Sequence, residues 1–235
     1  MTIGWYLCVG ATGTALALAS TAPAATVAGV YSSGVDAAGY ALTGGNGATD
    51  LHYWIVGGTS SDAIVGHQAK TFDEFGWFMP DTAGSRAINA TGGGGADSFT
   101  TIVFRTSFDL NGYAPASAML SGTAQADDAA SVKLNGHLIA SPPIGYTAAT
   151  SFAATDPAFF VAGINVLDFV LYNNTQHTAL RVGNLTVSAD RIAATVPEPA
   201  TWASLVTGFG AVGAVARRRR RGQRVSISTS ILTLA

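Results

Sequence analysis

The stretch FTTIVFRTSFDL, residues 99–110, alternates apolar and polar side chains over most of its length. One face of an extended chain would carry Ile102, Phe104, Phe108 and Leu110. The other face would carry Arg105 and Ser107. A period of two indicates a strand with one buried face, because successive side chains in a strand point to opposite sides. This stretch therefore predicts a β-strand that covers a hydrophobic core.

Further strands are predicted on both sides of this stretch. Residues 51–56 (LHYWIV) are rich in aromatic and β-branched side chains, which favour strands. Residues 131–139 (SVKLNGHLI) predict a hairpin, because Asn135-Gly136 tolerates the positive φ angles of a type I′ turn. Alternation returns at residues 165–172, and two short runs at residues 180–182 and 185–187 complete the set.

The whole pattern is that of an all-β protein. Roughly seven to nine short strands, separated by turn signals, favour a β-sandwich. The 28 glycines agree with this prediction, because glycine supplies turns and weakens helices. No window between residues 26 and 191 keeps a helical apolar period for three turns, so a doubly wound α/β fold is not expected.

The charge of the chain is unevenly distributed. The formal net charge is −2, yet Arg224 and the arginines at positions 217–221 are six of the twelve basic residues. Residues 26–196 hold six basic and thirteen acidic side chains, a net charge of −7. A domain of that charge repels phosphates, so we expect no nucleic-acid partner. Cys8 is the sole cysteine, which excludes an intrachain disulfide and zinc sites built on paired cysteines.

The N-terminus has the pattern of a secretory signal peptide. Residues 3–19 are almost free of polar side chains, and Ala22-Pro23-Ala24-Ala25 follows as a small-residue cleavage region. We therefore expect residues 1–25 to be a signal peptide. No lysine or arginine precedes the apolar run, so only the α-amino group supplies the usual positive charge. The alternative is a buried N-terminal strand or helix.

The C-terminal region has the pattern of a second targeting signal. Residues 201–216 form an uncharged run of sixteen residues, which as a helix would be about 24 Å long and short for a bilayer core of about 30 Å. The run is followed by Arg217, Arg218, Arg219, Arg220 and Arg221. The positive-inside tendency would leave these arginines in the cytoplasm and the large domain outside.

Pro197-Glu198-Pro199, the apolar run and the arginine cluster, in that order, resemble the PEP-CTERM sorting signal of exported proteins from Gram-negative bacteria that make extracellular polysaccharide. The resemblance implies recognition of Pro197, Glu198 and Pro199 by an exosortase, followed by loss of the short transmembrane helix and the arginines. The motif itself covers about residues 196–221. We expect the whole sorting segment to span residues 192–221. Residues 222–235 form a tail that the family normally lacks.

The middle of the chain, residues 26–191, resembles a galactose-binding-like, jelly-roll β-sandwich domain that accompanies this signal. The resemblance is carried by strand and turn segments at residues 77–88, 106–113, 126–128, 133–136 and 163–169. It implies a fold rather than a ligand.

Enzymatic motifs are absent from the sequence. There is no G-x-S-x-G elbow, and His52, His67, His137 and His177 form no H-E-x-x-H pair. The pair Asp127-Asp128 is a poor acid pair for glycoside hydrolysis, because neighbours on a strand point to opposite faces. We expect a noncatalytic protein; a hydrolase that uses Asp127 or Asp128 is the less favoured alternative.

Two kinds of binding site are predicted. Aspartates in glycine-rich loops offer the oxygen ligands that calcium prefers, and solvated turn aspartates are the alternative. No cofactor is expected apart from a possible structural calcium ion, for which the candidate ligands are Asp36, Asp50, Asp127 and Asp128. Sugars are bound by aromatic faces and by amide or carboxylate groups, and core packing or a plain turn is the alternative. The candidates for sugar are Trp54, Trp77, Tyr146, Asn173, Asn174, Gln176 and His177.

Together these features predict an exported protein of the outer surface or extracellular matrix that binds exopolysaccharide, as in a biofilm. Its expected partners are the exosortase, extracellular polysaccharide and, transiently, the inner membrane through residues 201–216. The alternative is a structural matrix or adhesion protein that binds other proteins.

Overall fold

The computed structural model describes residues 24–72, 79–175, 177–192 and 199–228. The chain divides into two compact units, one ending at Ile192 and one beginning at Ala193. Each unit is described separately.

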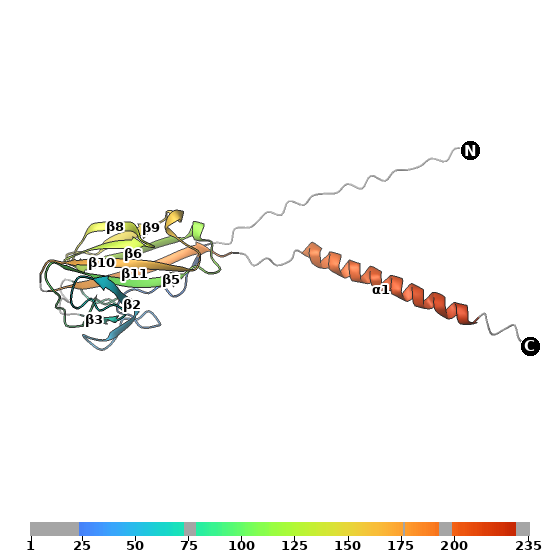
Figure 1. The fold of residues 1–235 in the computed structure, drawn as a ribbon, viewed down its shortest axis with the longest axis horizontal. Helices are drawn as coiled ribbons and strands as arrows, with labels where there is room; N and C mark the ends of the chain where they lie inside the picture. The colour runs from blue at the N-terminus through green and yellow to red at the C-terminus, as the bar shows by residue number, and fades with distance from the viewer. Residues whose placement is uncertain (1–23, 73–78, 176, 193–198, 229–235) are drawn as a thin grey trace, which may run out of the picture. The chain divides into compact units, whose positions relative to one another are not determined.

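The first unit is built from antiparallel β-strands (Figure 1). The described strands are β1 (Ala24–Thr26), β2 (Thr49–Gly58), β3 (Gln68–Thr71), β4 (Ile88–Asn89), β5 (Thr100–Asp109), β6 (Met119–Asp127), β7 (Ala129–Leu134), β8 (His137–Ile144), β9 (Thr150–Ala154), β10 (Ile164–Asn173) and β11 (Ala179–Asp190). Two single 3-10 turns, Pro115–Ser117 and Pro157–Phe159, interrupt the connections.

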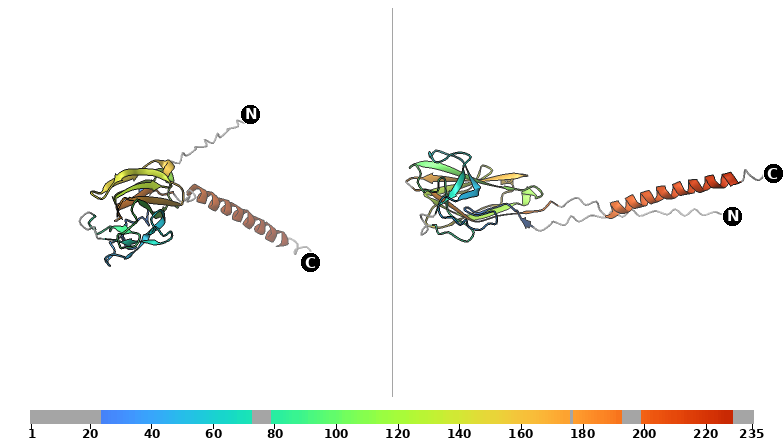
Figure 2. Two further views of the ribbon diagram at one scale, coloured as in Figure 1. Left: turned by 60° about the vertical axis from the view of Figure 1, so that its left-hand side comes forward. Right: turned by 90° about the horizontal axis from the view of Figure 1, so that it is seen from below.

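The strands form one continuous sheet that folds over into two layers (Figure 2). Its order is β8-β7-β10-β5-β2-β3-β4-β11-β6-β9, and β1 adds to β11. The layers meet through side chains: Phe169 of β10 lies edge-on to Phe152 of β9, with ring centroids 5.8 Å apart. The expected all-β architecture is confirmed.

Strand β5 has the buried face that its alternation predicts. Ile102, Phe104 and Phe108 of β5 are buried in the core between the layers. Phe104 pairs with Phe169 of β10, which is also fully buried. Arg105 lies on the opposite face of the strand. Burial of one face of β5 and β10 therefore supplies much of the hydrophobic free energy of this unit.

The predicted hairpin is also present. Asn135 (φ 49°) and Gly136 (φ 86°) join β7 to β8, and both have the positive φ of a type I′ turn. Asn135 Nδ2 donates to Asn165 Oδ1 at 2.7 Å, which ties the turn to the beginning of β10.

Two details of the strand predictions differ from the structure. The runs at residues 180–182 and 185–187 are one strand, β11, whose register with β6 shifts between Gly183 and Thr186. A bulge inserts a residue without ending the strand. The insertion interrupts the alternation of apolar and polar side chains, so the sequence shows two short runs instead of one strand. The described part also holds more strands than expected, because β3 and β4 are too short to show alternation.

The first strand overlaps the expected signal peptide. Ala24 pairs with Asp190 and Ala25 with Ala189 of β11. Cleavage after Ala25 would leave only Thr26 of β1. Residues 1–23 lie outside the described residues.

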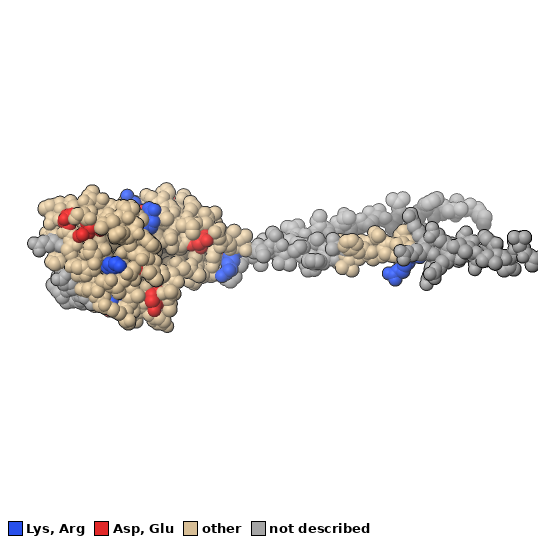
Figure 3. Space-filling model, turned by 60° about the horizontal axis from the view of Figure 1, so that its bottom comes forward, with Lys and Arg blue, Asp and Glu red and all other residues tan. Residues whose placement is uncertain are grey.

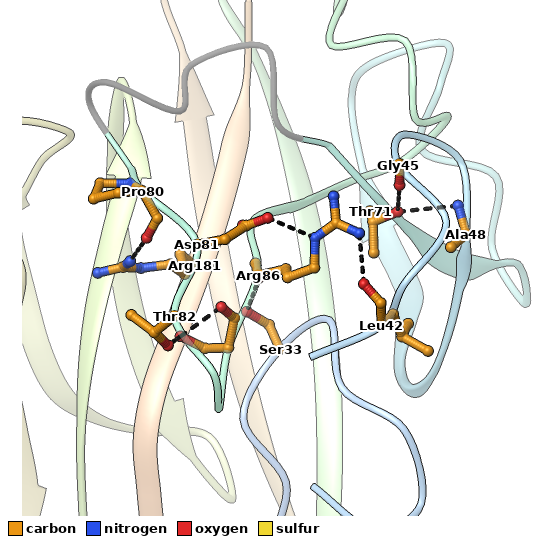
Figure 4. A network of polar contacts seen from close by, with 11 residues as sticks. Ser33, Leu42, Gly45, Ala48, Thr71, Pro80, Asp81, Thr82, Arg86 and Arg181 are labelled. Carbon is orange, nitrogen blue, oxygen red and sulfur yellow. Dashed lines mark hydrogen bonds and ion pairs between the residues drawn. The ribbon is translucent and has the colours of Figure 1, made fainter. Parts of the chain in front are cut away.

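A buried arginine fixes the loops beside β3 and β4 (Figure 4). Arg86 Nε pairs with Asp81 Oδ2 at 2.7 Å, and Arg86 Nη1 donates to the Leu42 carbonyl at 2.7 Å. Ser33 Oγ donates to the Arg86 carbonyl at 2.7 Å. Gly34 (φ 66°) lies so close that a Cβ there would be 2.6 Å from Arg86 Cβ. Removing Asp81 or the other partners would leave the buried Arg86 charge uncompensated, which is destabilising.

The second unit contains helix α1 (Pro199–Ser228). Pro199 is its first residue, a position that suits proline because the missing N–H has no helical partner there. The helix includes the whole apolar run and all five arginines of the cluster, and it enters the tail. Arg217 and Arg218 are exposed, whereas the side chains of Arg219, Arg220 and Arg221 lie outside the description. Pro197 and Glu198 also lie outside it.

No helix in the described ranges has the length and hydropathy that crossing a membrane requires.

Candidate functional site

One row of side chains crosses the outer face of four strands. Trp54 of β2 pairs with Arg105 of β5, Arg105 with Asp168 of β10, and Asp168 with Lys133 of β7. Directly paired residues project from the same face of a sheet. Because Phe104 and other neighbours of this row point into the core, the row itself faces outward. The order aromatic, basic, acidic, basic is thus a product of strand register.

The centre of this row is held by a two-pronged ion pair. Arg105 Nε and Nη2 donate to Asp168 Oδ1 and Oδ2 at 2.6 and 2.8 Å. These hydrogen bonds raise the pKa of the Arg105 guanidinium further above its usual range. Planar, bidentate pairs of this kind fix the direction of both side chains. Arg105 keeps three N–H donors for another partner, because the guanidinium has five.

Beside this row lies a groove of about 490 Å³, a size typical of ligand clefts. It is lined by residues of β2, β5, β10 and nearby loops: Gly29, Tyr31, Leu51, His52, Trp54, Ile55, Val56, Val65, Gly66, Arg105, Thr106, Ser107, Ile164 and Val166. Trp54 is 44% exposed. The groove therefore combines an accessible aromatic surface with hydroxyl and guanidinium donors.

A stacked pair of rings also lines the groove and forms a wall of it. Tyr31 and His52 lie 3.7 Å apart at 12°. His52 Nε2 donates to the Asp36 carbonyl at 3.2 Å, and Tyr53 donates to the Tyr31 carbonyl at 3.1 Å. The first bond fixes the His52 ring, and the second fixes the Tyr31 backbone that carries the other ring.

Asp36 and Asp50, two of the predicted calcium ligands, support this wall. Asp50 is fully buried, and its carboxylate accepts the Gly34 N–H at 2.6 Å and the His52 N–H at 2.8 Å. Burial raises the pKa of the Asp50 carboxyl. Asp36 Oδ1 accepts the Ala38 and Tyr40 N–H groups, as in an Asx turn. Both carboxylates thus fix loop backbone, and the alternative of solvated turn aspartates does not describe Asp50.

The other two predicted calcium ligands, Asp127 and Asp128, lie with part of the predicted sugar-binding loop. Asp128 Oδ2 accepts the Asn174 N–H at 2.6 Å, and the Asp127 carbonyl accepts the Thr178 hydroxyl at 3.0 Å. Burial, and then the charge of Asp128, raise the pKa of Asp127 to about 6, against an opposing effect of His177. The two carboxyl groups interact because the chain turns here instead of continuing as a strand. The expectation that they point apart is wrong.

Metal binding stays a prediction. Across the described ranges, no three His, Cys, Asp or Glu side chains gather as a metal ion would need.

The predicted sugar-binding residues do not all meet. Trp54 lines the groove. Asn173 pairs with Thr100 of β5, which is five residues from Arg105, so Asn173 lies about 17 Å from Arg105 along the strand. The amide of Asn173 donates to the Asp97 carbonyl at 2.8 Å, which makes Asn173 a loop anchor. Asn174 and His177 adjoin Asp127 and Asp128. Tyr146 is half-buried against a small cluster around Phe72. Trp77 and Gln176 lie outside the described residues.

Sequence reasoning missed Arg105, Tyr31 and His52 as groove residues. The outward position of Arg105 was readable from the alternation of β5, but its contact with Trp54 depends on strand register. Tyr31 lies outside any predicted strand, so no local pattern marked it.

The chain matches no protein-family model and no curated protein. A solved structure titled "CBM4 structure and function" aligns with 61% of this chain and 88% of its own, at 17% sequence identity and a TM-score of 0.31.

Proposed function

We propose that the first unit is a noncatalytic carbohydrate-binding domain, and that the groove at Trp54 is its site. The observation that carries the proposal is the exposed indole of Trp54 at the edge of the groove. An indole face packs against the C–H surface of a pyranose ring. A sugar-binding site also needs polar side chains that form hydrogen bonds with the hydroxyl groups of the sugar. Arg105, Ser107 and Thr106 are such neighbours.

The groove is preorganised for such a ligand. Arg105 is oriented by Asp168, and the Tyr31–His52 stack is fixed by Asp50 and the Asp36 carbonyl. Side chains held in this way lose little conformational entropy when a ligand binds. We further propose a jelly-roll, galactose-binding-like identity for the sandwich, in line with the segments that resemble that domain.

We propose that the address segments deliver this domain to the outer surface or the extracellular matrix. Residues 1–25 would serve as the signal peptide and residues 192–221 as the PEP-CTERM signal for an exosortase. An acidic domain of this kind suits a matrix of extracellular polysaccharide, where it would bind glycan strands.

The test is binding of the full chain to an array of polysaccharides, with a Trp54→Ala variant. We expect Trp54→Ala to weaken binding about tenfold or more, since a central aromatic anchor commonly contributes about 2 kcal/mol. The matched control is Phe99→Ala, because Phe99 is 86% exposed and precedes β5, away from the groove. Equal binding by both variants would refute the site. Absence of any glycan binding, together with self-association in sedimentation, would favour the matrix-adhesion alternative.

A further inference from the structure

Trp54 lines a second hollow as well as the groove. The second hollow, of about 300 Å³, is lined by Thr49, Trp54, Gly66, His67, Gln68, Lys70 and Ala90. Trp54 and Gly66 are common to both hollows. A glycan that stacks on the indole would therefore extend to either side of it, with at least one sugar unit in each hollow.

The charge of these two hollows is opposite to that of the domain. Residues 26–196 have thirteen acidic and six basic side chains. Even so, no Asp or Glu lines either hollow among the described residues, whereas Arg105 lines the first and Lys70 the second. On the face in Figure 3, charged side chains of both signs are few and scattered. The two hollows are thus lined by cationic side chains and by no carboxylate of the described residues, with Asp168 beside the first hollow offsetting part of the charge of Arg105.

Both cations keep donors for a ligand. Lys70 Nζ donates to Thr49 Oγ1 at 2.6 Å, and an ammonium has two further N–H donors. No carboxylate of the described residues forms an ion pair with Lys70. Arg105 is paired with Asp168, but its side chain is 40% exposed and three N–H donors remain. Lys133, the next member of the row beyond Asp168, adds positive charge on the same face.

We propose that the ligand of this groove is an anionic polysaccharide, such as a polyuronate, which lies across Trp54 with acidic groups at Arg105 and Lys70. The inference rests on the proposed carbohydrate function and names its ligand class. Carboxylate and guanidinium or ammonium groups form charge-assisted hydrogen bonds, which are stronger than those of neutral hydroxyls. The negative charge of the rest of the domain would exclude polyanions from other surfaces.

The experiment compares polygalacturonate with its fully methyl-esterified form, which has the same backbone without the charge. We expect the full chain to bind the acid form about tenfold tighter than the ester at low salt, because hydrogen bonds between charged groups are the stronger ones. Lys70→Gln should weaken binding of the acid form about fivefold and weaken binding of the ester by a smaller factor, because the lost hydrogen bond to a neutral oxygen is the weaker one. The charge-matched control is Arg191→Gln, because Arg191 stacks over Tyr113 away from the groove. It should change neither affinity.

The arginine cluster of α1 is present in every variant, so its attraction for polyanions is the same in wild type, Lys70→Gln, Arg191→Gln and Trp54→Ala. The cluster itself favours the acid form over the ester, so the comparison between variants, and not the acid preference of the wild type alone, tests the groove. Equal binding of the acid form by wild type, Lys70→Gln and Trp54→Ala would mean that the cluster alone holds the polymer, and the proposal would be wrong. If the ester bound as tightly as the acid form and Trp54→Ala abolished both, the carbohydrate function would stand and the anionic ligand would be refuted. A parallel array of neutral and sulfated glycans tests whether the anionic group must be a carboxylate. No binding to any glycan would overturn both proposals.

Discussion

Asp127 is a carboxyl group whose ionisation opposes folding. Burial and the charge of Asp128 raise its pKa to about 6 in the folded chain, whereas an unfolded aspartate titrates near 3.9. Between these values the folded chain binds more protons than the unfolded chain. The contribution of this group to stability is therefore greatest below about pH 4 and is lost as the pH rises through about 6.

An Asp127→Asn substitution should reverse this loss. We expect the variant and the wild type to be equally stable at pH 4, and the variant to be more stable at pH 7.5. The gain should be about 1 kcal/mol, since Asp127 is partly exposed and solvent screens part of the effect. Urea unfolding at pH 4, 5, 6 and 7.5 measures the difference. A loss of stability in Asp127→Asn at pH 7.5 would contradict this account.

Single residues also show how far the site was readable from the sequence. Trp54 was predicted as a sugar-binding candidate, with core packing as the alternative. An aromatic residue in a strand serves either purpose, and the local pattern does not distinguish them. Its exposure and its partner Arg105 follow from pairing between β2 and β5, which are about fifty residues apart in the chain. The residue types at Asn173 and Asn174 suit a sugar-binding loop. The Asn173 amide, however, donates a hydrogen bond to the Asp97 carbonyl and so has a structural role.

At the scale of elements, the β7–β8 turn and the start of β10 are joined by a buried amide. Asn165 is fully buried, and its Oδ1 accepts the Val161 N–H at 2.9 Å. Its Nδ2 donates to the Val161 and Gly163 carbonyls at 2.8 and 2.9 Å. The pair Asn135–Asn165 then links this loop to the hairpin.

Replacing Asn165 by alanine should cost about 3 kcal/mol in the free energy of unfolding, since it leaves several buried partners unpaired. The matched control is Asn111→Ala, because Asn111 is exposed and bonds only to nearby Asp109. That substitution should cost less than about 1 kcal/mol. Chemical denaturation of both variants gives the comparison. Similar losses in the two would show that the buried network has no special part in joining these elements.

Long strands were predictable because each buries one face, which imposes a period of two on the sequence. β2, β5, β10 and the β7–β8 hairpin were all anticipated for this reason. β3 and β4 have four and two residues, too few for a period to appear. β11 was divided in two because its bulge at Gly183 interrupts the alternation.

At the scale of the whole molecule, the class of fold follows from the sequence, whereas the strand order does not. The order depends on contacts between distant segments, such as β4 with β11, and local patterns do not encode these. The groove is a product of that order, because its lining comes from β2, β5 and β10 together.

The termini of the mature protein provide a test at this scale. We expect protein from the cell envelope and the medium to lack the arginines at positions 217–221 and the apolar N-terminal segment. Intact-mass measurement of both fractions identifies the two ends directly. A surface protein that still carries the arginine cluster would refute exosortase processing. As a control, replacing Pro197-Glu198-Pro199 by alanines should retain the C-terminal segment and leave the N-terminal cleavage unchanged.

The pairing of β1 with β11 sets the time at which this sheet can form. Ala24 lies opposite Asp190, so the first described strand has no partner until nearly the whole domain has been synthesised. At about 5–20 residues per second, the ribosome needs on the order of ten to thirty seconds to travel between them. β4 and β6 wait for the same strand. A nascent chain of this protein would therefore complete its sheet only after nearly the whole first unit has been synthesised.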